Sequence, residues 1–160
     1  MNKQAQELTE QLSNSVFIPQ VVAVDKRGVL AELTDRLVSE GRIQLADRDA
    51  VLASLLDRED KMSTGLQYGV AIPHARTDCA KELIGMIAIS QEGVPFSSLD
   101  GAPATIFVLT LSPRADTNSH IKFLAEVSRK LSSRRIREKL LEAKTSQSMV
   151  AAICSDSHVL

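Results

Sequence analysis

The segment Thr-Ile-Phe-Val-Leu-Thr-Leu at residues 105–111 is the clearest strand in the chain. It is rich in β-branched and aromatic side chains, which favour extended backbone, and Pro113 ends it because proline has no N–H to donate to a ladder. A second short apolar run, Leu-Ile-Gly-Met-Ile-Ala-Ile at residues 83–89, has the same character. Both runs predict buried strands.

Helical patterns lie on either side of these strands. Apolar residues at helical spacing predict helices over residues 26–40, 47–60, 117–131, 134–143 and 146–153. The remaining segments are expected to be an edge strand over 15–24, a short helix or frayed arm around 8–12, and a loose tail from 155. Strands that alternate with helices predict an α/β fold, a mixed β-sheet flanked by helices in a single-domain sandwich over residues 1–160.

Composition excludes several classes of function. Of 160 residues, 19 are Lys or Arg and 20 are Asp or Glu, and a net charge of −1 disfavours binding to nucleic acid by bulk electrostatics. No apolar run approaches the roughly 20 residues that span a bilayer, so we expect no membrane insertion. Cys79 and Cys154 are too few and too far apart for a disulfide scaffold, which favours a cytoplasmic location.

The first candidate for chemistry is His74, which follows the short apolar run Val-Ala-Ile-Pro at residues 70–73. Because proline interrupts a strand, the next side chain is presented at a strand end, where α/β proteins tend to place their sites. Small Ala75 and cationic Arg76 follow it. A histidine at a loop mouth with no role is the alternative reading.

Two further residues are candidates. His120 lies in the first turn of the expected helix from residue 117, where unpaired amides and the helix dipole favour an anion such as phosphate. Arg58 ends the second helix and could clamp a phosphoryl group with its forked donors, or simply complement the helix dipole. His158 stands near the C-terminus, and we assign it no function.

Other chemistries lack their sequence motifs. The chain contains no GxGxxG, GxxxxGK[ST], GxSxG or HExxH, so we expect neither a cofactor nor a metal ion. A basic stretch at residues 129–137 has no aromatic residues between its charges. We read it as a solvated face or a surface for a protein partner rather than a nucleic-acid site.

Taken together, these residues resemble a known family. The likeness is to the IIA components of the bacterial phosphoenolpyruvate-dependent sugar phosphotransferase system, of the fructose/mannitol type that includes the nitrogen-regulatory IIA proteins. It covers roughly residues 8–154. The segments that carry it are Arg58-Glu59, Ser63-Thr64-Gly65, Val70-Ala71-Ile72-Pro73-His74-Ala75, Asp100-Gly101-Ala102-Pro103, Ser119-His120-Ile121 and Leu124-Ala125.

The resemblance implies a phosphoryl carrier. His74 would accept a phosphoryl group from the phosphocarrier protein HPr or its nitrogen-branch counterpart, His120 would orient that group, and Arg58 would help to neutralise it. The implied role is regulation in the nitrogen branch. Arg76, which follows the Pro-His motif, favours this role. The alternatives are a sugar-branch protein that passes phosphate to a IIB partner, and an interaction module that is not phosphorylated.

Overall fold

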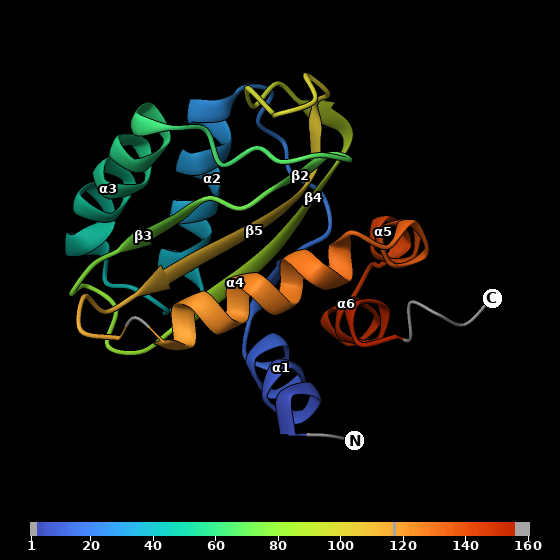
Figure 1. The fold of residues 1–160 in the computed structure, drawn as a ribbon. Coiled ribbons are helices and arrows are strands. Elements are labelled where there is room, and N and C mark those ends of the chain that lie inside the picture. Colours follow the sequence, from blue (N-terminus) through green and yellow to red (C-terminus); the bar gives the residue numbers. More distant parts are fainter. Residues whose placement is uncertain (1–2, 117, 156–160) are drawn as a thin grey trace.

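The computed structural model describes residues 3–116 and 118–155, which form a mixed α/β fold (Figure 1). The helices are α1 (Lys3–Ser13), α2 (Lys26–Ser39), the 3-10 turn η1 (Leu45–Asp47), α3 (Arg48–Lys61), α4 (Asn118–Leu131), α5 (Arg134–Glu142) and α6 (Ser146–Ile153). The strands are β1 (Val16–Ile18), β2 (Val70–Ala71), β3 (His74–Arg76), β4 (Ile84–Val94) and β5 (Ala104–Ser112).

The strands form one open sheet in the order β1-β4-β5-β2, with β3 also paired to β5. The long central strands β4 and β5 are antiparallel, whereas β1 runs parallel to β4 and both β2 and β3 run parallel to β5. This confirms the predicted mixed sheet with helices on its faces.

Alternation along β5 divides the core into two layers. Phe107, Leu109 and Leu111 belong to the cluster that packs against α2 and α3, whereas Ile106 and Val108 belong to the cluster that includes α1, α4, α5 and α6. Side chains that are two residues apart on a strand share a face. The residues that continue the Ile106–Val108 face therefore point towards the side of the sheet that α4 covers (Figure 1).

Helix boundaries agree with the sequence patterns. Helix α2 ends at Ser39, and Gly41 follows the C-cap Glu40 with a φ of +73°, the left-handed conformation that glycine adopts most readily. Helix α3 begins after Asp47, although the Asp47 side chain makes no capping hydrogen bond. The Asp116 carboxylate accepts a hydrogen bond from the amide of Ser119 at the start of α4, at 3.1 Å.

The length of the expected edge strand needs correction. The edge strand is only Val16–Ile18, because Pro19 interrupts it, although the amide of Val21 still donates to the Ile89 carbonyl of β4, at 2.7 Å. Of the two alternatives for the N-terminal segment, the helix is confirmed, and its Leu8 and Leu12 side chains are buried. On α4, Ile121 is 58% exposed, and the buried face is formed by His120, Phe123, Val127 and Leu131. The expected loose tail and His158 fall on residues 156–160, outside the described residues.

Pro73 divides one edge of the sheet into two short strands. Val70 and Ala71 pair with Ile106 and Phe107, and pairing resumes where His74 lies opposite Thr110. The Pro73 carbonyl still accepts a hydrogen bond from the amide of Thr110, at 3.1 Å. His74 therefore begins a new strand, β3, instead of lying in a loop, and the sheet fixes its direction.

Within the described residues, no helix has both the length and the apolar character required to cross a bilayer.

Candidate functional site

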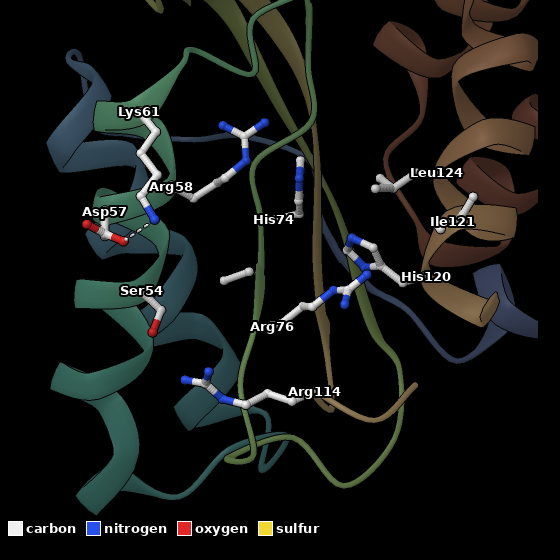
Figure 2. Close-up of a pocket in the computed structure, with 11 residues that line it drawn as sticks. Ser54, Asp57, Arg58, Lys61, His74, Arg76, Arg114, His120, Ile121 and Leu124 are labelled. Carbon is white, nitrogen blue, oxygen red and sulfur yellow. Dashed lines mark ion pairs between the residues drawn. The ribbon is translucent and has the colours of Figure 1, made fainter. Parts of the chain in front are cut away.

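A pocket of about 560 Å³ lies over the edge strand β3, between α3 and α4 (Figure 2). Helix α3 contributes side chains from one side and α4 from the other, with His74 between them. The residues that line it are Ser54, Asp57, Arg58, Lys61, His74, Ala75, Arg76, Arg114, His120, Ile121 and Leu124. All three residues singled out from the sequence, His74, His120 and Arg58, thus meet in one pocket.

The half-buried imidazole of His74 is held by its own backbone neighbourhood. Its Nδ1 lies 2.7 Å from the carbonyl oxygen of Ile72. A carbonyl only accepts hydrogen bonds, so Nδ1 carries the proton and Nε2 carries a lone pair. Nε2 has no hydrogen-bond partner among the described residues. Burial lowers the pKa of His74, and the nearby Arg58 and Arg76 guanidinium groups lower it further, so the ring is neutral at pH 7.

His120 faces His74 from the third residue of α4. The two ring centroids are 5.2 Å apart at an interplanar angle of 59°. His120 is buried, and this burial, with smaller contributions from His74 and Arg76, lowers its pKa to about 4. Its Nδ1 lies 3.2 Å from the hydroxyl of Ser112 at the end of β5. Two neutral imidazoles therefore share the pocket at pH 7.

Arg58 reaches the pocket from the last turn of α3. Its Nη1 donates to the carbonyl oxygen of Met62, at 2.6 Å, which fixes the guanidinium near the end of its own helix. A helix C-terminus favours a cation, so the dipole interpretation of this residue also holds. No carboxylate lies within ion-pair distance of Arg58 in the described part of the chain.

The remaining charges make the pocket cationic. Lys61 is paired with Asp57, at 3.2 Å, and Arg114 lies 3.9 Å from Asp78. The side chain of Arg76 has no hydrogen-bond or ion-pair partner among the described residues. It shares a face of β3 with His74, two residues away, and Figure 2 shows its guanidinium directed towards His120. Arg58 and Arg76 are thus two guanidinium groups without a carboxylate, an arrangement that favours an anion.

Helix α4 contributes less to anion binding than its sequence position suggests. The amide of Ser119, which would face an anion at the helix start, is already bonded to the Asp116 carboxylate. The positive character of the pocket comes from arginine side chains instead.

Two residues that support the pocket, Glu59 and Ser112, are not evident from the sequence. The Glu59 side chain is only 1% exposed and pairs with Lys26 Nζ at 3.2 Å. It also accepts hydrogen bonds from the amide and the hydroxyl of Thr64. Ser112 lies at the end of the strongest strand and has no local feature that marks it. Thr110 lies opposite His74, and Ser112 is two residues further along β5. The two side chains therefore share a face of the sheet.

The geometry suits transfer of an anionic group. A neutral imidazole with an accessible lone pair is a nucleophile, and guanidinium groups without a carboxylate partner can compensate the charge that a phosphoryl group brings. No group of three or more His, Cys, Asp or Glu side chains in the described residues could hold a metal ion.

Comparisons with known proteins agree on one family. Residues 10–155 match the family described as "Phosphoenolpyruvate-dependent sugar phosphotransferase system, EIIA 2". The chain is 40% identical over 124 residues to the "PTS system fructose-specific EIIA component" of Haloferax volcanii, a match that covers 78% of this chain and 79% of that protein.

Solved structures show the same fold. The nitrogen regulatory protein IIA-Ntr from Neisseria meningitidis is 28% identical, with a TM-score of 0.79 over 92% of this chain and 99% of that one. A complex of enzyme IIA-Mtl and phosphorylated enzyme IIB-Mtl from Escherichia coli matches with 18% identity and a TM-score of 0.70, over 88% of this chain and 94% of that one. The matched residues span nearly the whole sequence, and the chain belongs to the EIIA type 2 family of the phosphoenolpyruvate-dependent sugar phosphotransferase system.

Proposed function

We propose that this protein carries a phosphoryl group on Nε2 of His74, accepted from phospho-HPr or its nitrogen-branch counterpart. One observation carries the proposal. The hydrogen bond from Nδ1 to the Ile72 carbonyl leaves the Nε2 lone pair unpartnered, in a pocket that also holds Arg58 and Arg76. Membership of the EIIA type 2 family supports it.

The proposed step conserves its atoms and electrons. The Nε2 lone pair of His74 attacks the phosphorus of the donor's phosphohistidine, a new N–P bond forms, and the donor's N–P bond breaks. The donor ring, which carries a proton on its other nitrogen, leaves as a neutral imidazole with the electron pair of the broken bond, and the proton on Nδ1 of His74 stays in place. Little covalent work remains for the protein beyond in-line positioning and charge compensation. His120 and Arg58 are the residues proposed for those two tasks.

Two downstream roles are proposed for the phosphorylated protein. In the first it is a regulator of the nitrogen branch, a role supported by structural similarity to IIA-Ntr. In the second it passes phosphate to a IIB partner for sugar uptake, a role supported by 40% identity to a fructose-specific EIIA component. Both roles place the protein in the cytoplasm, where Cys79 and Cys154, which are free in the structure, stay reduced.

Labelling tests the carrier function. The protein, enzyme I and HPr are incubated with phosphoenolpyruvate that carries a labelled phosphoryl group. We expect an acid-labile phosphohistidine on the wild type and none on His74→Ala. A wild-type protein that takes no label from HPr or from the nitrogen-branch donor contradicts the proposal and favours an interaction module.

A second assay separates the two roles. The phosphorylated protein is mixed with a fructose-type IIB domain, and transfer of label is followed over time. Rapid transfer supports the sugar branch, and retention of label with binding to regulated proteins supports the nitrogen branch. His120→Ala should slow transfer without a matching loss of folding.

A further inference from the structure

The hydroxyl of Ser112 is the side-chain partner of His120. Ser112 is fully buried, and its Oγ lies 3.2 Å from His120 Nδ1. No other partner of this hydroxyl occurs in the described residues. The contact joins the end of β5 to the first turn of α4, next to the edge strand that carries His74.

This contact determines where the ring proton of His120 resides. A buried hydroxyl is stabilised when its proton has an acceptor, and among the described residues His120 Nδ1 is the acceptor within reach. If Nδ1 carried the ring proton, the serine O–H would be buried without an acceptor, which is unfavourable. Ser112 therefore donates, Nδ1 accepts, and the single proton of the neutral ring lies on Nε2.

The tautomer matters because the ring is neutral. Burial, His74 and Arg76 lower the pKa of His120 to about 4, so the imidazolium, with a proton on each nitrogen, is rare at pH 7. A neutral ring presents either a donor or a lone pair at Nε2, and the partner of Nδ1 decides which.

The two histidines of the pocket consequently differ. His74 Nδ1 faces a carbonyl, which only accepts, so the lone pair of His74 is on Nε2. His120 Nδ1 faces a hydroxyl that donates, so the N–H of His120 is on Nε2. One imidazole is prepared as a nucleophile and the other as a hydrogen-bond donor, with ring centroids 5.2 Å apart.

We propose that Ser112 is a positioning residue that holds His120 in the Nε2–H tautomer, so that this ring donates a hydrogen bond to a phosphoryl oxygen on His74. The second half of this statement rests on the proposed function. Without the serine hydroxyl, the Nδ1–H tautomer of His120 becomes populated and directs a lone pair at the phosphoryl oxygens, which repels them.

The tautomer is measured directly on the unphosphorylated protein by ¹⁵N NMR of the imidazole nitrogens at pH 7. We expect Nε2–H for His120 in the wild type, a mixture of both tautomers in Ser112→Ala, and Nε2–H again in Ser112→Thr, which restores a hydroxyl. The matched control is Thr110→Val. Thr110 Oγ1 is also buried on β5 but has no hydrogen-bond partner, so this variant should leave the His120 signals unchanged.

Phosphoryl transfer supplies the second measurement. We expect the initial rate of labelling to fall about tenfold in Ser112→Ala, the size of one hydrogen bond to a charged group, and to recover in Ser112→Thr. Thermal unfolding of the same variants identifies any loss of rate that comes from unfolding. If Ser112→Ala is unfolded, the labelling rate of Ser112→Thr tests the role of the hydroxyl.

The outcomes separate this inference from the proposed function. A wild-type His120 with its proton on Nδ1, or a Ser112→Ala variant with unchanged nitrogen shifts, overturns the inference whatever the labelling shows. A folded Ser112→Ala variant that shows mixed tautomers but labels at the wild-type rate overturns the role in transfer. A wild type that takes no label but has the expected tautomer contradicts the proposed function and leaves the assignment of the proton supported.

Discussion

The carboxylate of Glu59 accepts two hydrogen bonds from Thr64, one from its amide at 3.1 Å and one from its hydroxyl. The carbonyl of Thr64 in turn accepts from the amide of Ile72, at 3.0 Å, and the carbonyl of Ile72 accepts from His74 Nδ1. A buried carboxylate on α3 is thus connected through two backbone groups to the histidine of the pocket. Glu59 does not line the pocket, but its negative charge acts to raise the pKa of His74, against the larger lowering effect of burial.

We expect Glu59→Ala to lower the free energy of unfolding by about 3 kcal/mol, because it leaves the Lys26 ammonium and the Thr64 amide without their buried acceptor. Urea unfolding followed by circular dichroism measures the loss. The matched control is Glu40→Gln, which removes an exposed ion pair with Arg36 and should cost less than about 0.5 kcal/mol. Equal losses in the two variants would contradict the structural role of Glu59.

Acid should destabilise the protein through His120. Its pKa is about 4 in the folded state and 6.5 in the unfolded state, so between these values the unfolded chain binds more protons. Stability is therefore complete above about pH 6.5 and falls as the pH drops towards 4, by about 3 kcal/mol over the whole window. Urea unfolding at pH 7 and pH 5 measures this loss.

His120→Gln is the control for the acid effect, since glutamine does not titrate. The variant should lose about 2 kcal/mol less than the wild type between pH 7 and pH 5. His74, whose pKa burial also lowers, acts in the same direction and remains in both proteins. If both proteins lose the same stability, His120 is not the titrating group.

Arg76 should contribute to phosphoryl acceptance, because it shares a face of β3 with His74 and has no carboxylate partner among the described residues. We expect Arg76→Ala to lower the initial labelling rate about tenfold, and Arg76→Lys to recover only part of it because lysine lacks the forked donors. Arg134→Ala removes an exposed arginine that is paired with Glu138 outside the pocket, and it should label normally. A wild-type rate in Arg76→Ala would remove this residue from the site.

Gly65 should not tolerate a side chain. A Cβ there would lie 2.8 Å from Ser98 Cα and 2.9 Å from the Phe96 carbonyl oxygen, both backbone atoms that cannot move aside independently. We expect Gly65→Ala to cost about 2 kcal/mol in urea unfolding. The comparison is Gly41→Ala, where nothing lies within 4 Å but φ is +73°, so only about 1 kcal/mol of backbone strain is expected. An unchanged free energy of unfolding in Gly65→Ala would show that the segments that carry Gly65 and Ser98 separate easily.

The predictability of the fold differs between its elements. The strand at 105–111 and the helix over 26–40 were predictable because a strong local pattern coincides with the buried face. The β-strand pairings were not, since parallel pairing of β1 with β4 depends on contacts distant in sequence. On α4, Ile121 matches the helical pattern but lies on the pocket side, and it is exposed because the pocket leaves that side of the helix uncovered.

The candidate site was predictable in its residue types more than in its contacts. A proline that interrupts a strand indicated His74, and the first turn of a helix indicated His120. The sequence could not show that Ser112 bonds to His120 or that Glu59 is buried, because a serine at a strand end and a glutamate in a helix are each most often solvated. Tertiary contacts, rather than local preference, determine both.

The division of the sheet edge at Pro73 also affects how the protein meets other chains. Long exposed edges act as templates for strand addition and aggregation, but here β2 has two residues and β3 has three. Beyond β1 on the opposite edge, the amides of Val22 and Ala23 are already donated to the Glu32 carboxylate. In the described part of the chain, neither edge therefore offers a long continuous ladder to which a strand of a second chain could be added.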